Sequence, residues 1–100
     1  MKNVPLDPKT LVRAAKTLRV LAHPARLHII DQLKSKKRSV GELAAALDLP
    51  QAVISKHLAL LKSAGVLASQ TDCNFRHYSL KNTRVLEILN CIKKSCPKEA

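Results

Sequence analysis

The chain has 100 residues, and its 18 Lys and Arg against 7 Asp and Glu give a formal net charge of +11. Because 46% of the residues are hydrophobic, the chain is not a disordered polycation, and with two Gly and five Pro it is neither collagen-like nor of low complexity. No apolar run approaches the roughly 20 residues that span a bilayer, and the N-terminus is not a signal peptide, so we expect one soluble, cytoplasmic domain with no membrane partner.

Two helices are predicted in the first third of the chain. Asp7-Pro8 is typical of a helix start, with the proline in the first turn. An apolar stripe with i, i+4, i+7 and i+11 spacing continues this helix and consists of Leu11, Ala15, Leu18 and Ala22. His23-Pro24 ends it, and Pro24 opens a second helix that runs to about Lys34. The inward-facing residues of the second helix are expected to be Leu27, Ile30 and Leu33.

Two more helices are predicted on either side of a tight turn. Ser39 and Glu42 have the spacing of a capping box, which predicts a short helix over residues 42–47. Pro50 starts the next helix, and Gly65, the usual residue type just past a helix C-terminus, ends it. Its buried face is expected to consist of Ile54, Leu58 and Leu61.

The periodicity changes after Gly65. Residues 66–71 and 76–80 have the pattern of strands, and Asp72-Cys73-Asn74-Phe75 between them predicts a hairpin turn. Asn82 is expected to cap a last helix, which Pro97 ends. One face of that helix carries Val85, Ile88, Leu89, Ile92 and Cys96. The fold class is therefore mainly α with a small β-hairpin, in the order α-α-α-α-β-β-α.

A short helix, a tight turn and a second helix form a helix-turn-helix unit, and a hairpin directly behind it makes a winged helix. The second helix of such a unit can lie in the major groove of DNA. Gln51 is expected to read adenine, Ser55 to contact a base or phosphate, and Lys56 to reach guanine or phosphate. The remaining outward residues are the small Ala52 and Ala59. The alternative is an ordinary amphipathic helix with a solvated face, but the net positive charge indicates an anionic partner and favours DNA.

Four segments carry a more specific resemblance. Residues 21–30 (LAHPARLHII), 41–44 (GELA), 54–67 (ISKHLALLKSAGVL) and 78–80 (YSL) resemble the conserved strings of the ArsR/SmtB family of bacterial repressors. The likeness spans about residues 18 to 92, and the third string is its most specific part.

The resemblance implies a homodimeric winged helix-turn-helix repressor that binds a double-stranded DNA operator. The helix-turn-helix would occupy about residues 39–64, the wing about 66–80, and the dimerisation helices about 8–22 and 82–96, within a single domain over 1–100. The apolar stripes of the first and last helices agree with this, the second of them consisting of Val85, Leu89 and Ile92. A chain this short cannot bury two extra stripes internally, so dimerisation is expected on physical grounds as well.

The wing is where the chain departs from its relatives, which usually place Gly-Arg at the tip. Cys73-Asn74 stands there instead, so the tip has no cation. Arg76 and His77, one on each face of the strand, are expected to replace it, with Arg76 as the phosphate contact. The other candidates for DNA binding are Lys36, Lys37, Arg38 and His57.

The sequence leaves several alternatives open for the effector that would control DNA binding. No cofactor is expected to be required. Both zinc-type sites of the family are absent by residue type: residues 39–46 have no cysteine, and the last helix has no His or Asp and only Glu87. The four histidines form no spaced pair, so packing, capping or phosphate roles are expected for them. Soft sulfur suits trivalent arsenicals, which makes Cys73, Cys91 and Cys96 the candidate metalloid ligands. A redox disulfide switch and cysteines without any effector role are the alternatives.

Three functions remain in competition. The chain is a DNA-binding repressor released by a thiophilic ligand or by oxidation, a DNA-binding regulator without an effector, or a winged-helix module for protein or RNA. Catalysis is not expected, because the sequence has no Gly-rich phosphate loop, no paired carboxylates and no supported Ser-His-Asp arrangement.

Overall fold

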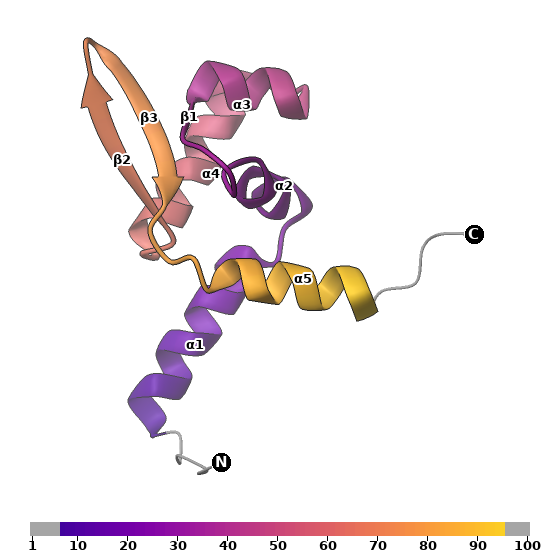
Figure 1. Ribbon diagram of the computed structural model, residues 1–100. Coiled ribbons are helices and arrows are strands. Elements are labelled where there is room, and N and C mark those ends of the chain that lie inside the picture. Colours follow the sequence, from indigo (N-terminus) through magenta and orange to yellow (C-terminus); the bar gives the residue numbers. More distant parts are fainter. Residues whose placement is uncertain (1–6, 96–100) are drawn as a thin grey trace.

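The computed structural model describes residues 7–95, which form five helices and three strands. In chain order these are α1 (Pro8–Leu21), α2 (Pro24–Gln32), β1 (Arg38–Ser39), α3 (Val40–Leu47), α4 (Gln51–Ser63), β2 (Leu67–Asp72), β3 (Phe75–Leu80) and α5 (Val85–Ser95). Figure 1 shows α2, α3 and α4 grouped together, the hairpin β2–β3 extending to one side, and α1 projecting from the opposite end beneath α5. The winged helix-turn-helix prediction is confirmed.

The predicted helix starts are confirmed by their hydrogen bonds. The Thr10 amide donates to the Asp7 carboxylate at 2.7 Å, which caps α1. The Ser39 hydroxyl accepts from the Glu42 amide at 3.2 Å, while the Glu42 carboxylate accepts from the Ser39 amide at 2.9 Å. Both halves of the capping box are therefore formed at the start of α3. Each bond satisfies an amide that the first turn of a helix leaves without an intrahelical partner.

Three helix boundaries differ from the prediction by two residues or more, and the first is the start of α3, which lies at Val40 and not at residue 42. Helix α2 ends at Gln32, two residues before the expected Lys34. The prediction that Asn82 caps the last helix directly is wrong, because α5 begins only at Val85. The Asn82 side chain instead accepts from the Arg84 amide at 3.1 Å and closes a turn that precedes the helix. Such a local side-chain bond competes with the helical conformation.

The sheet has three strands in the order β1-β3-β2, all antiparallel, so the prediction of two strands missed β1. Arg38 and Ser39 pair with Tyr78 and His77 across the open edge of β3. The hairpin turn is the predicted one: the residues at its tip, Cys73 and Asn74, have φ values of 50° and 70°. Two successive left-handed residues give the type I′ turn, whose twist matches that of the flanking strands.

The core is aliphatic apart from Tyr78, as expected for a chain with two aromatic residues. It joins all the helices and the sheet, and consists of Leu21, Ile29, Ile30, Leu33, Leu43, Ile54, Leu58, Leu61, Val66, Leu67, Tyr78, Val85 and Leu89. No helix of residues 7–95 is long and apolar enough to cross a membrane.

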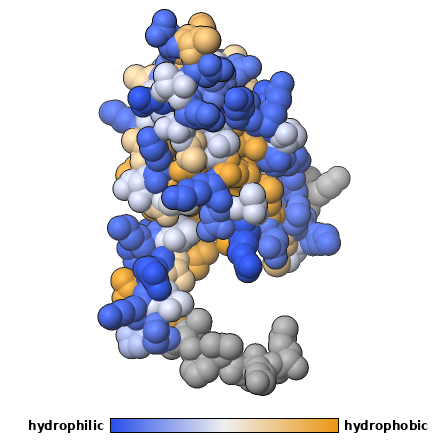
Figure 2. All heavy atoms as spheres, turned by 60° about the vertical axis from the view of Figure 1, so that its left-hand side comes forward, coloured by the Kyte–Doolittle hydropathy of each residue, from blue (hydrophilic) through white to orange (hydrophobic). Residues whose placement is uncertain are grey.

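The structure leaves only some residues of the apolar stripes on α1 and α5 exposed to solvent. On α1, Leu11 and Leu18 are 49% and 53% exposed, and Figure 2 shows apolar side chains along this projecting helix. On α5, however, Val85 and Leu89 are buried in the core of the chain itself, so their assignment to an exposed dimer stripe is wrong. Only Ile92 of the predicted α5 stripe remains exposed, beside Ile88.

Candidate nucleic-acid interface

The helix-turn-helix unit is formed by α3, α4 and the three residues between them. Asp48 adopts a left-handed conformation, with φ of 57°, and the Leu49 amide donates to the Ala44 carbonyl at 3.1 Å, which ends α3 sharply. Pro50 then takes the N-cap position of α4, with φ of −60°. The fully buried Ile54, Leu58 and Leu61 fix the inner face of α4 against α2 and α3.

The outer face of α4 carries the residues that the sequence assigned to DNA. Gln51, Ala52, Ser55, Lys56 and Ala59 are all exposed. The first turn of α4 has no acidic residue and no side-chain cap, so no side chain of that turn offsets the positive end of the helix dipole. The small alanines allow the helix backbone to approach a surface closely. The charge and the small side chains of this face are therefore suited to a negatively charged surface that a helix can approach closely, such as a groove of a nucleic acid.

His57 lies on the same helix but is not part of that face. It is half-buried, and its Nδ1 accepts a hydrogen bond from Arg26 Nε at 3.2 Å. Its ring centroid is 4.7 Å from that of His23, with the two planes tilted by 54°. The expectation that His57 contacts DNA is corrected accordingly: it packs α4 against the start of α2. His23 is a capping residue, because its Nδ1 accepts from the Ala25 amide at 3.1 Å.

The two candidate residues of the wing lie on opposite faces of β3, as predicted. The register pairs Arg76 with Thr71, and Ser69 with the buried Tyr78, so Arg76 lies on the core-facing side of the sheet, out toward the tip. Further down that side, Lys62 of α4 donates to the Ser69 hydroxyl at 2.7 Å. Arg76 is exposed and thus extends the same side of the molecule as α4.

His77 faces the other side of the sheet, between Ser39 of β1 and Gln70 of β2. It is half-buried, and its Nδ1 is buried without a hydrogen-bond partner among the described residues. This position is less suited to a phosphate contact than that of Arg76. Sequence alternation predicted the opposite faces but not the third strand that partly covers His77.

The basic loop before β1 divides into two kinds of residue. Lys36 and Lys37 are exposed and remain available for a phosphate backbone. Arg38 is half-buried, and its Nε donates to the Gln32 carbonyl at 2.9 Å, near the end of α2. Arg38 therefore anchors the loop, which makes it a weaker candidate for DNA than its two neighbours.

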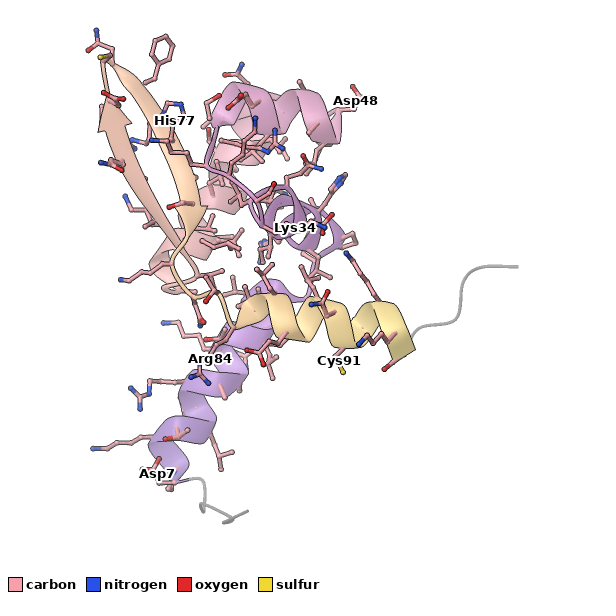
Figure 3. All side chains as sticks on the ribbon, in the orientation of Figure 1. Asp7, Lys34, Asp48, His77, Arg84 and Cys91 are labelled. Atoms are coloured by element: carbon pink, nitrogen blue, oxygen red, sulfur yellow. The ribbon has the colours of Figure 1, made fainter. Side chains whose placement is uncertain are left out.

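The cysteines do not converge within the described part of one subunit. Cys73 lies at the tip of the hairpin and Cys91 on α5, at opposite ends of the molecule, and both are exposed free thiols (Figure 1). Figure 3 shows Cys91 on the side of α5 that faces away from α2. Cys96 lies outside the described residues. Among residues 7–95, no three His, Cys, Asp or Glu side chains are grouped so that they could hold a metal ion.

Comparisons with known proteins agree with this geometry. Residues 23–69 match the family model described as bacterial regulatory protein, arsR family. The HTH-type transcriptional repressor SmtB of Mycobacterium tuberculosis is 44% identical over 83 residues, which cover 82% of this chain and 62% of that protein. The biofilm growth-associated repressor of Agrobacterium fabrum is 36% identical over an alignment that covers 89% of this chain and 79% of that protein. Among solved structures, HlyU from Vibrio cholerae superimposes with a TM-score of 0.80 at 30% identity, covering 91% of this chain and all of that one.

Proposed function

Because the chain belongs to the ArsR family of bacterial regulatory proteins, which are regulators and not enzymes, we propose that it represses transcription as a homodimer bound to a double-stranded DNA operator. The observation that carries the proposal is the outer face of α4. Gln51, Ser55 and Lys56 are exposed, and they lie on a helix whose first turn has no acidic side chain and no side-chain cap. The charge of +11 per subunit supplies the attraction to a phosphate backbone.

In the proposed complex, α4 lies in the major groove. Its first two turns approach base edges, with Gln51 suited to adenine and Lys56 to guanine or a phosphate. Arg76 on the wing, with Lys36 and Lys37 before β1, contacts the backbone on either side. These backbone contacts set affinity and register, whereas the α4 contacts set sequence preference.

The dimer follows from the exposed apolar residues at one end of the molecule. Leu11, Val12 and Leu18 of α1 and Ile88 and Ile92 of α5 are between 37% and 68% exposed. A twofold axis through this end would cover them with the same residues of a second copy and place the two α4 helices on one side. Two half-sites about one helical turn apart, or a multiple of it, would then be read together.

We also infer that the thiols release the repressor from DNA when a trivalent arsenical or another thiophilic effector binds, or when they are oxidised. Cys73 and Cys91 are both exposed and not in a disulfide, and a twofold dimer would contain two copies of each. Cysteine at a left-handed turn position has no packing reason to be there, since the tip contacts no core. The competing possibility is an effector-independent regulator, which the separation of the two thiols within one subunit favours.

A binding experiment tests the DNA proposal. A duplex is selected from a random library with the purified protein, and its retardation is measured for the parent, Lys56→Glu and Lys94→Glu. Both variants change the charge by the same amount, but Lys94 is on the last turn of α5 and Lys56 on the outer face of α4. We expect Lys56→Glu alone to abolish retardation. Equal binding by all three proteins would refute the role of α4.

A second experiment tests the effector. The reduced protein on its duplex is titrated with arsenite, phenylarsine oxide or hydrogen peroxide, next to a variant with Cys73, Cys91 and Cys96 all replaced by Ser. Release of the parent but not of the variant supports thiol sensing. An identical response of the two proteins assigns the effector to other residues, and no response of either supports the effector-independent regulator.

A further inference from the structure

One guanidinium joins three helices at the centre of the molecule. Arg26, in the first turn of α2, donates from Nη1 to the Val20 carbonyl of α1 at 3.0 Å and from Nε to His57 Nδ1 of α4 at 3.2 Å. All of these groups are half-buried. The contact to His57 spans 31 residues of sequence and is the polar link between the start of α2 and the DNA-facing helix.

The link depends on the protonation of His57. Imidazole Nδ1 accepts a hydrogen bond only when it carries no proton, so Arg26 and a protonated His57 face each other as two cations with no bond between them. The His23 ring contacts the His57 ring at a tilted angle, and its own Nδ1 accepts a hydrogen bond from the Ala25 amide. Burial, then the charges of His23 and Arg26, lower the pKa of His57.

Among residues 7–95, no carboxylate is hydrogen-bonded or ion-paired to His57, His23 or Arg26, and this holds also for Asp48 in the turn before α4, for Asp7 at the start of α1 and for Glu87 of α5. Glu42 of α3 is bound to the Ser39 amide, and Asp31 of α2 is paired with Lys34 and Lys93. Asp72 of β2 is at the wing tip. The charged groups of α1 that line a hollow beside the end of α4 are the cations Arg13 and Lys16. On α4 itself the charged residues are Lys56, which is exposed, and Lys62, which donates to Ser69.

We propose that Arg26 and neutral His57 are a positioning pair that holds α4 in its DNA-binding orientation relative to α1, and that protonation of His57 releases α4 and weakens DNA binding. The inference rests on the proposed function and adds a proton-dependent control to it. Neither residue touches DNA; both act through the orientation of α4. Because α1 carries the exposed apolar residues proposed for the dimer, the pair also connects that interface to the DNA-facing surface.

The size of the effect follows from the proton balance. A released His57 has an ordinary pKa of about 6.5, so at pH 5.5 about nine in ten released molecules carry the proton. The released state therefore gains about tenfold over the linked state between pH 8 and pH 5.5. The dissociation constant for the selected duplex should therefore rise over this interval at constant salt, by about fivefold where the released and linked states are equally populated at pH 8 and by about tenfold at most.

The matched variant is His57→Asn. The Asn Oδ1 occupies nearly the position of His Nδ1 and accepts from Arg26, but it does not titrate. The pH profile of this variant reports the contribution of all groups other than His57 that gain a proton. We expect the His57→Asn profile to be flat or inverted between pH 8 and pH 5.5, with circular dichroism confirming that both proteins stay folded. Identical profiles for parent and variant would overturn the proposal.

A second measurement separates this inference from the DNA proposal. If no duplex is retarded even at pH 8, the DNA proposal fails, and the pair is then followed by NMR in the free protein. The Arg26 Nε–H resonance is expected to lose its hydrogen-bonded shift as the His57 imidazole gains its proton, at a pH below the ordinary value for histidine. An Arg26 resonance that is unchanged while His57 titrates would overturn the positioning pair.

Discussion

The dimer interface is tested most simply at Leu18, which is 53% exposed on α1. Full burial of a leucine side chain is worth about 2 kcal/mol, so covering the exposed half contributes about 1 kcal/mol. A twofold interface contains Leu18 twice, which makes Leu18→Ala cost about 2 kcal/mol per dimer, or about 30-fold in the dimer dissociation constant. Alanine has the higher helix propensity, so α1 itself should not be weakened.

Sedimentation velocity over a concentration series measures this change, and Phe75→Ala is the matched control. Phe75 is 66% exposed at the wing tip, far from α1, so its truncation should leave the dimer unchanged. If the subunit works alone, Leu18→Ala is an ordinary surface substitution with an effect within about 0.5 kcal/mol. Equal association of the parent, Leu18→Ala and Phe75→Ala would refute the interface assigned to α1.

Three further predictions follow from individual contacts. Ser39→Ala removes one half of the capping box and should lower the free energy of unfolding by about 1 kcal/mol, measured by urea denaturation; an unchanged midpoint would show that α3 does not depend on its cap. Arg76→Ala should flatten the dependence of log K on log salt by about 2, or about one ion for each subunit, while sequence preference is kept; an unchanged slope would exclude Arg76 from the backbone contacts. Partial burial opposes ionisation of Asp31, but its bonds to Lys93 and Lys34 outweigh burial and lower its pKa below the ordinary 3.8. A lowered carboxylate pKa stabilises the fold above the ordinary value, and this effect is lost as the pH falls through the lower, folded value. The stability difference between the parent and Asp31→Asn in thermal melts should therefore be present at pH 6 and disappear only at a pH below 3.8; a difference that persists in stronger acid would have another origin.

The features that depend on neighbouring residues along the chain could be predicted from the sequence. The caps at Asp7 and Ser39 and the two-residue turn at Cys73-Asn74 are set by residues no more than three positions apart. The buried face of α4 follows from helical periodicity in the same way. Local sequence gave a wrong prediction at Asn82. The same side chain can cap a helix or close a turn, and residues 82–84 form the turn before α5 begins at Val85.

The features that depend on distant residues could not be predicted. His57 has the same sequence neighbours whether it faces DNA or Arg26, and its partner is 31 residues away. Strand β1 has two residues and exists only because β3 offers a free edge. The apolar face of α5 is continuous in sequence, but the structure divides it between the core of its own subunit, at Val85 and Leu89, and the surface, at Ile88 and Ile92.

The central claim is that two copies of this chain present their α4 helices together to one duplex. Native mass spectrometry of the protein on its selected duplex, at low salt, tests it most directly. We predict a complex of two subunits per duplex that forms with the parent and is lost with Lys56→Glu. A complex with one subunit, or one that Lys56→Glu forms equally well, would contradict the account.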